Sequence, residues 1–224
     1  MSEYTVHAPK KQALILQLER TVKALNANRM DACWVATKEE ACEKVRELLP
    51  KGGLVAAGGS MTLAECGILE AVREGDYQYL NREAVPPEEI PALYRKAFSA
   101  DAYLMSSNAI TEQGELYNVD GNGNRVAALI FGPKAVIVVA GANKIVPDLP
   151  AAVQRLKETA APANAIRLNQ ETPCTKCGVC AGIKGGMAAG CQSEQRICSS
   201  YVVSGYQRVP NRIHVILVAE NLGY

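Results

Sequence analysis

The chain has 224 residues, and its 24 Lys and Arg against 23 Asp and Glu give a formal net charge of +1. This balance, without any long run of charge, argues against a protein that binds nucleic acid or an anionic membrane through a basic surface. No apolar run reaches the length of a membrane span, and residues 1–11 lack the apolar core of an export signal. We therefore expect a cytoplasmic protein whose eight cysteines are thiols or metal ligands.

Predicted strands and helices alternate along the chain. Helices are expected at 10–28, 37–49, 62–73, 86–99 and 149–160, and strands at 32–36, 54–57, 102–105, 135–140 and 213–218. This order predicts an α/β fold with a mainly parallel sheet and helices on both faces. We expect residues 1–224 to form one domain, from which a cysteine-rich excursion departs at about 172–200.

A glycine loop, Gly58-Gly59-Ser60, separates the strand at 54–57 from the next helix. Backbone N–H groups at such a junction can bind an anion, and Ser60 or Thr62 can add a hydroxyl hydrogen bond. The loop matches neither the dinucleotide-binding fingerprint nor the phosphate-binding P-loop. The alternative is a tight turn, in which Thr62 and Glu65 form a capping box that only begins the helix.

Polar residues follow the strand at 102–105, where ligands collect in open α/β sheets. Ser106, Ser107 and Asn108 stand at its end, and Arg125 is the only arginine of the polar stretch beyond it. Arg125 can clamp a carboxylate or phosphate, so we predict a ligand role for Asn108 and Arg125. Asp120–Gly123 contains Asp-Gly and Asn-Gly pairs, which favour a hairpin.

A second polar pair, Asn143 and Lys144, follows the strand at 135–140 and repeats this strand-end arrangement. Lys144 is therefore a second candidate contact for an anion. The alternative is an ordinary solvated surface lysine.

The cysteine-rich excursion carries five candidate metal ligands: Cys174, Cys177, Cys180, Cys191 and Cys198. Thiolates suit zinc and iron–sulfur clusters above other metals. Cys174, Cys177 and Cys180, separated by two residues each, resemble the first part of a bacterial ferredoxin motif. However, no Cys-Pro follows at the ferredoxin spacing, and zinc sites usually show two pairs of cysteines. We expect a metal site, either iron–sulfur or zinc. The alternative is a set of free structural or redox thiols.

Six segments together resemble the LUD-domain family of lactate utilization proteins. They are Gly58–Leu63, Ser106–Gly114, Asn118–Val126, Gly132–Lys134 with Gly141–Val146, Thr172–Lys176 and Arg212–Tyr224. The resemblance implies a fold similar to that of glucosamine-6-phosphate deaminase, ribose-5-phosphate isomerase and coenzyme A transferases. It also implies a part in oxidising L-lactate to pyruvate, alongside partner proteins that carry iron–sulfur clusters.

The resemblance further implies four cysteine ligands, which map to Cys174, Cys180, Cys191 and Cys198. This sequence departs from the family pattern twice. Cys177 stands where a threonine is common, and Ala181–Gly190 looks like an insertion. All five cysteines are therefore kept as candidate ligands.

Three functions compete on this evidence. The first is a component of a lactate-oxidising system that binds a small anionic or nucleotide-like ligand at Ser60, Asn108 and Arg125. The second is an isomerase or transferase-type enzyme on a phosphorylated or coenzyme A substrate, which needs a general base, and Glu65 and Glu112 are the carboxylates near the predicted strand ends. The third is a non-enzymatic metal- or redox-sensing module. The sequence leaves open whether the chain forms an oligomer.

Overall fold

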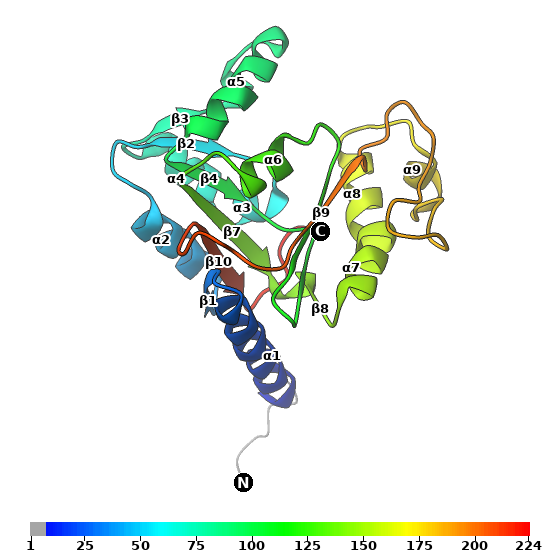
Figure 1. The fold of residues 1–224 in the computed structure, drawn as a ribbon, viewed down its shortest axis with the longest axis horizontal. Helices are drawn as coiled ribbons and strands as arrows, with labels where there is room; N and C mark the ends of the chain where they lie inside the picture. The colour runs from blue at the N-terminus through cyan, green and yellow to red at the C-terminus, as the bar shows by residue number, and fades with distance from the viewer. Residues whose placement is uncertain (1–7) are drawn as a thin grey trace.

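The larger of the two sheets has six strands in the order β1–β10–β7–β4–β2–β3, and every neighbouring pair in it is parallel. The strands are β1 (Asp31–Val35), β2 (Leu54–Ala57), β3 (Gln78–Leu80), β4 (Ala102–Met105), β7 (Ala135–Gly141) and β10 (Ile213–Val218). The computed structural model describes residues 8–224. The mainly parallel sheet predicted from the alternation of strands and helices is confirmed (Figure 1).

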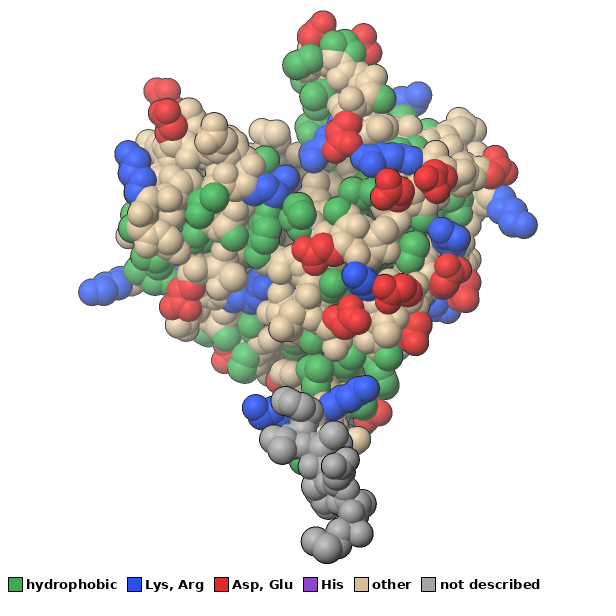
Figure 2. Space-filling model, turned by 180° about the vertical axis from the view of Figure 1, so that it is seen from behind, with side chains coloured by type: hydrophobic (Ala, Val, Ile, Leu, Met, Phe, Trp, Pro, Cys, Tyr) green, Lys and Arg blue, Asp and Glu red, His purple; other side chains and the backbone are tan. Residues whose placement is uncertain are grey.

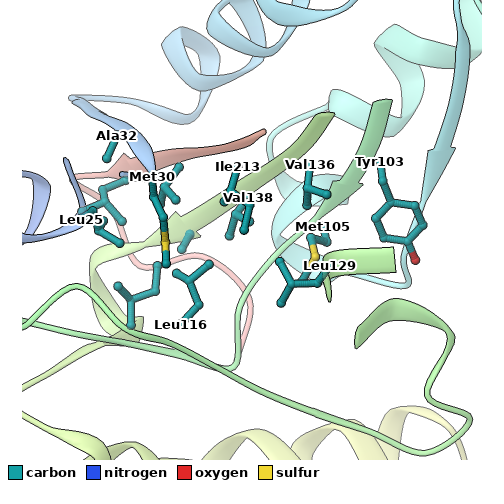
Figure 3. Packing of buried hydrophobic residues seen from close by; sticks show 14 of the residues in the cluster. Leu25, Met30, Ala32, Tyr103, Met105, Leu116, Leu129, Val136, Val138 and Ile213 are labelled. Carbon is teal, nitrogen blue, oxygen red and sulfur yellow. The ribbon is translucent and has the colours of Figure 1, made fainter. Parts of the chain in front are cut away.

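Helices cover both faces of this sheet. On one face, Val136 and Val138 of β7 pack beneath α1 (Ala8–Ala27) and α6 (Asn124–Ile130), in the cluster drawn in Figure 3. On the other face, Ile137 and Val139 pack beneath α2 (Lys38–Leu48), α3 (Met61–Glu65) and α4 (Ile68–Glu74). Successive side chains of a strand point to opposite faces, so a continuously apolar β7 is what a sheet buried on both sides requires.

A second, four-stranded sheet was not predicted. Its order is β8–β5–β6–β9, with strands β5 (Ala109–Thr111), β6 (Leu116–Asp120), β8 (Ile145–Val146) and β9 (Ser200–Ser204). One face, through Ile110 and Leu116, joins the cluster beneath α1. The other face, through Tyr117, packs on the helices α7 (Leu149–Arg155), η5 (Leu156–Ala160) and α8 (Ala161–Arg167). These helices lie on the side of the molecule that carries the cysteine segment (Figure 1).

The prediction of a hairpin at Asp120–Gly123 was wrong. A hairpin does occur nearby, between β5 and β6, but Asp120–Gly123 leads from β6 into α6. The Asp120 carboxylate accepts the backbone N–H groups of Arg125 and Val126, and Gly123 has φ +78°. The same Asp-Gly and Asn-Gly signals therefore mark the start of a helix, where a carboxylate binds free N–H groups.

The single helix predicted at 62–73 is two helices, α3 and α4, separated by Gly67 with φ +68°. Ser60 is the N-cap, because its Oγ accepts the N–H of Leu63 at 3.3 Å. Thr62 therefore does not begin the helix, and its buried hydroxyl bonds elsewhere.

The remaining elements are shorter. They are α5 (Ile90–Lys96), α9 (Pro173–Cys177) and the 3₁₀ turns η1 (Arg82–Ala84), η2 (Pro87–Glu89), η3 (Ala97–Ser99) and η4 (Ala142–Lys144). Acidic and basic side chains are interspersed over the face shown in Figure 2. Within residues 8–224, no helix has the length and apolarity needed to cross a membrane.

Candidate functional site

A polar cleft of about 680 Å³ lies at the carboxyl ends of three neighbouring strands of the large sheet. Ser60 follows β2, Ser106 follows β4 and Lys144 follows β7, and all three line the cleft. The opposite wall comes from α8 and the cysteine segment, with Asn164 and Arg196 among its residues. The volume is in the range of small-molecule sites, and the position is the one where open parallel sheets bind ligands.

Six of the residues predicted to bind a ligand line this cleft. They are Gly59, Ser60, Ser107, Asn108, Arg125 and Lys144. The other three, Gly58, Thr62 and Asn143, lie just behind its wall and bond to or approach parts of the chain that form it. Long-range folding thus gathers residues from the loops after β2, β4 and β7 and from the start of α6 at one edge of the sheet.

Lys144 is buried, with 4% of its surface exposed. Its Nζ donates to Thr62 Oγ1 at 2.8 Å and to Ser106 Oγ at 3.0 Å, and no carboxylate pairs with it within residues 8–224. Burial, together with the nearby charges of Arg155 and Arg125, lowers the pKa of Lys144 to about 7. The alternative of a solvated surface lysine is therefore wrong.

Arg125 is held in place by the protein itself. Its Nε donates to Asp120 Oδ1, one terminal nitrogen to the Ser106 carbonyl and Asn118 Oδ1, and the other to Asn108 Oδ1 and the Val119 carbonyl. A guanidinium has five N–H donors, so none remains for a ligand. The predicted clamp on a ligand anion therefore conflicts with this geometry, in which Arg125 joins β4, β6 and α6 and positions the cleft wall.

The glycines of the loop after β2 make room for two arginines. A Cβ on Gly58 would lie 3.1 Å from Arg125 Cδ, and a Cβ on Gly59 would lie 2.8 Å from an Arg82 terminal nitrogen. Neither glycine has a positive φ, so close approach, not backbone conformation, accounts for both. Arg82 lines the cleft and has no carboxylate within ion-pair distance in the described chain.

Asn108 lines the cleft. Its Oδ1 accepts the N–H of Val119 and a proton of Arg125, which orients its amide nitrogen away from them. Its carbonyl accepts Arg155, whose Nε also donates to the Asn143 carbonyl at 2.9 Å. Ser107, by contrast, uses its buried hydroxyl within the chain, on the Ala109 carbonyl at 2.8 Å.

Thr62, Asn143 and Glu65 hold the segment 220–224. Thr62 donates to the Leu222 carbonyl, the Asn143 amide bonds both Leu222 N–H and the Gly223 carbonyl, and Glu65 accepts the Gly223 N–H at 2.7 Å. These contacts place Tyr224 in the cleft wall, where its buried hydroxyl has no partner within residues 8–224. Thr62 and Asn143, predicted as ligand contacts, thus bond to the segment that brings Tyr224 to the cleft.

Glu112, the other candidate general base, lies away from the cleft. Its carboxylate accepts Gln17 at 2.9 Å and Arg20 at 3.2 Å, which ties the β5–β6 hairpin to α1. Glu65 does not line the cleft either. Neither carboxylate is therefore placed to remove a proton from a ligand bound there.

The cysteine segment is held by two basic side chains. Lys157, buried in η5, donates to the carbonyls of Gly182, Gly185 and Gly186 at 2.7, 3.2 and 2.7 Å. Arg196 donates to the carbonyls of Ala188, Cys191 and Cys198 and to the Tyr201 hydroxyl. The predicted insertion at 181–190 is thus fastened to η5, and residues beyond it, such as Arg196, line the cleft.

The five thiols of this segment do not converge as metal ligands do. Within residues 8–224, no three His, Cys, Asp or Glu side chains are grouped to hold a metal ion. Burial raises the pKa of Cys198 to about 11, and the neighbouring thiols Cys180, Cys174 and Cys191 act in the same direction. Cys177 is exposed and turns to the Pro173 and Val179 carbonyls. Cys174, Cys180 and Cys191 thus lie near Cys198 without forming a closed ligand shell, and the metal stays a prediction from the sequence.

Sequence reasoning placed Ser106 at a strand end without choosing it as a ligand contact, and it missed Arg82, Tyr224 and Arg155 as parts of the site. The first three line the cleft, and Arg155 supports the strand ends from α7. Ser106 carried a signal, because it stands at the end of β4. Arg82 and Arg155 carried none, because each comes from a segment that shows no ligand-binding pattern.

Comparison with known proteins supports the fold and the family. Residues 18–218 match the family model of the LUD domain. A DUF162 family protein from Deinococcus radiodurans has a similar solved structure, with 14% identity, a TM-score of 0.51 and alignment over 93% of this chain and 98% of that one. No curated protein sequence matches this chain.

Ribose 5-phosphate isomerase A structures give weaker matches. The enzyme from Neisseria gonorrhoeae aligns at 14% identity over 50% of this chain and 54% of its own, with a TM-score of 0.34. The enzyme from Methanocaldococcus jannaschii aligns at 14% identity over 72% and 76%, with a TM-score of 0.36. These two likenesses carry no argument about ligands or activity.

Proposed function

We propose that this chain, which belongs to the LUD-domain family, binds a small anionic ligand in its strand-end cleft as a component of a system that oxidises L-lactate to pyruvate. Membership of the family relates the chain to lactate utilization. The observation that carries the ligand proposal is the set of arginines that lines the cleft, of which Arg82 and Arg167 have no carboxylate partner within residues 8–224.

Five cationic side chains and two carboxylates line the cleft. The cations are Arg82, Arg125, Lys144, Arg167 and Arg196, and the carboxylates are Asp120 and Glu194. Asp120 is already paired with Arg125, so it does not offset the remaining cations. A cleft lined mainly by one sign of charge attracts ligands of the other sign.

Two arginines remain available for direct contact. Arg82 has no carboxylate partner in the described chain, and Arg167 is held through Asn164 Oδ1 at 3.1 and 2.8 Å. Arginine suits carboxylates and phosphates, because its planar fork offers paired donors. The amide of Asn108 adds a neutral donor at the same edge of the sheet.

The alternative of an isomerase or transferase-type enzyme is weaker. Glu65 and Glu112, its predicted general bases, are bonded to the 220–224 segment and to α1. A metal- or redox-sensing module would need the thiols to move closer together, and it would leave the basic lining of the cleft unexplained. Anion binding explains that lining without any rearrangement.

Ligand binding can be tested by thermal unfolding in the presence of L-lactate, pyruvate or inorganic phosphate. A ligand at a hundred times its Kd stabilises a protein by about 2.7 kcal/mol. The double variant Arg82→Gln/Arg167→Gln should lose most of this protection, whereas Arg95→Gln, an exposed arginine that does not line the cleft, should keep it. Equal protection of all three proteins would contradict the proposed site.

The role in lactate oxidation calls for a test in the source cell. Deletion of the gene should impair growth on L-lactate, and the wild-type gene should restore it. Lys144→Met should fail to restore growth at an equal level of protein. Normal growth of the deletion strain on L-lactate would exclude the proposed role.

A further inference from the structure

Lys144 combines burial, access to the cleft and the lack of an anionic partner. Two hydroxyls, Thr62 Oγ1 and Ser106 Oγ, take two of its hydrogen bonds, at 2.8 and 3.0 Å. A neutral amine has two N–H donors, which is enough for both hydroxyls, so loss of one proton keeps these two hydrogen bonds and frees the lone pair. The third direction at Nζ is left for the cleft, which Lys144 lines.

A second buried lysine shows what a structural lysine looks like in this molecule. Lys157 Nζ donates to three carbonyls, those of Gly182, Gly185 and Gly186, and carbonyls only accept. Three such bonds require the ammonium form, which has no lone pair. Lys144 has two hydroxyl partners and no carbonyl partner, so it can lose one proton and keep both hydrogen bonds. Lys157 would lose a hydrogen bond if it became neutral.

The charges that face Lys144 favour its neutral form. Burial has the largest effect, and Arg155 and Arg125 add to it, so that its pKa falls to about 7 against the weaker opposing effect of Glu65 and Cys66. A lysine is a nucleophile only as the free amine, and desolvation beside other cations is how reactive lysines are activated. The free amine is therefore more accessible at neutral pH in Lys144 than in a solvated lysine.

We propose that Lys144 forms an imine with a small carbonyl compound that carries a carboxylate or a phosphate group. The inference rests on the proposed anion binding, because the anionic group would be held by the arginines of the cleft while the carbonyl carbon meets Nζ. A 2-oxo acid and a phosphorylated sugar share this chemistry, and the experiment below distinguishes them.

The step balances without any oxidant. The lone pair of Nζ attacks the carbonyl carbon, a C–N bond forms, and the carbonyl oxygen takes a proton from the amine. The hydroxyl then leaves with the second amine proton as water, and a C=N bond remains. Ser106 Oγ lies 3.0 Å from Nζ and is placed to pass these protons, whereas Thr62 donates its own proton to the Leu222 carbonyl and holds the amine in position.

Reduction by sodium cyanoborohydride tests the proposal on the intact protein. The reagent adds hydride to the imine carbon, and the product is a stable secondary amine that peptide mass spectrometry can locate. The protein is incubated with pyruvate in one arm and with ribose 5-phosphate in the other. We expect an adduct on Lys144 in at least one arm, with labelling of Lys144 at least tenfold above that of any other lysine.

Matched variants control for chance labelling. Lys134→Met removes a lysine that is 79% exposed and should leave the adduct intact, whereas Lys144→Met should abolish it. A pyruvate adduct identifies a 2-oxo acid site, and a ribose 5-phosphate adduct identifies a sugar phosphate site. No adduct in either arm, or equal labelling of many lysines, overturns the proposal.

Failure of the imine and failure of anion binding give different results. L-Lactate and inorganic phosphate have no carbonyl that forms an imine, so protection by them without any trapped adduct leaves the anion site standing and removes the imine. Absence of both protection and adduct removes the anion site as well. Thermal protection and adduct formation are measured on the same preparation of the protein.

Discussion

The carboxylate of Asp120 and the guanidinium of Arg125 lie 2.8 Å apart, with 10% and 12% of their side-chain surfaces exposed. This pair joins the end of β6 to the first turn of α6, because Asp120 also accepts two N–H groups of that helix. The same guanidinium reaches the end of β4 through the Ser106 carbonyl. One ion pair thus fixes three elements around the cleft.

Loss of one partner of this pair should destabilise the fold strongly. Arg125→Ala leaves a nearly buried carboxylate and four other acceptors without their donor, and we expect a loss of about 3–5 kcal/mol in the free energy of unfolding. Arg125→Lys should recover little, because an ammonium cannot reproduce five planar donors. Urea unfolding measures these changes, and Lys134→Gln, in an exposed pair, should change little. An unchanged midpoint for Arg125→Ala would contradict the assigned positioning role.

The stability of the protein should depend on pH through Lys144. Its pKa is about 7 in the folded state and 10.5 ordinarily, so the unfolded state binds more protons between these values. The contribution of Lys144 to stability is therefore least favourable below about pH 7 and rises as the pH increases toward 10.5. Relative to Lys144→Met, the wild-type protein should gain up to about 1.4 kcal/mol per pH unit in this window.

Urea unfolding of both proteins from about pH 6 to about pH 9 checks this dependence. The groups that face Lys144 from the neighbouring elements, Arg155, Arg125, Glu65 and Cys66, are present in both proteins. Their own titrations therefore largely cancel in the difference. Parallel stability curves for the two proteins would show that Lys144 keeps its ordinary pKa.

Lys157 should control the order of the cysteine segment. Lys157→Met leaves the carbonyls of Gly182, Gly185 and Gly186 without their donor, so we expect residues 181–190 to be cleaved several-fold faster in limited proteolysis. Lys184→Met, at an exposed position of the same segment, should be cleaved at the wild-type rate. Equal cleavage of the two variants would show that the segment is ordered by other contacts, such as those of Arg196.

The predicted metal site should depend on Cys198 and not on Cys177. Cys198 lies near Cys174, Cys180 and Cys191, whereas Cys177 is exposed and points to carbonyls of its own turn. We predict that anaerobically purified Cys177→Ser keeps the iron and sulfide, or the zinc, of the wild-type protein, and that Cys198→Ser loses it. Elemental analysis and a visible spectrum measure the content. A wild-type protein without metal would contradict the predicted site.

The elements with a clear local pattern were predicted well. Strands β2 and β4 were predicted at the residues where they lie, and the alternation of strands and helices was enough to predict the parallel sheet. The second sheet was missed because its strands are two to five residues long, and their pairing joins β6 to β9 across the whole cysteine segment. Pairing at such separations leaves no periodic signal in either segment.

The sequence by itself determined which strands end in polar loops, and these loops contain Ser60, Ser106 and Lys144. Only the tertiary structure decided what each residue does there. Lys144 is 82 residues from Thr62 and 38 from Ser106, and their contact, which removes the amine from water, depends on the order of strands in the sheet. Arg125 likewise looked available for a ligand until folding surrounded it with acceptors. A side chain's chemistry depends on its neighbours in space, and local sequence does not specify neighbours that come from distant segments.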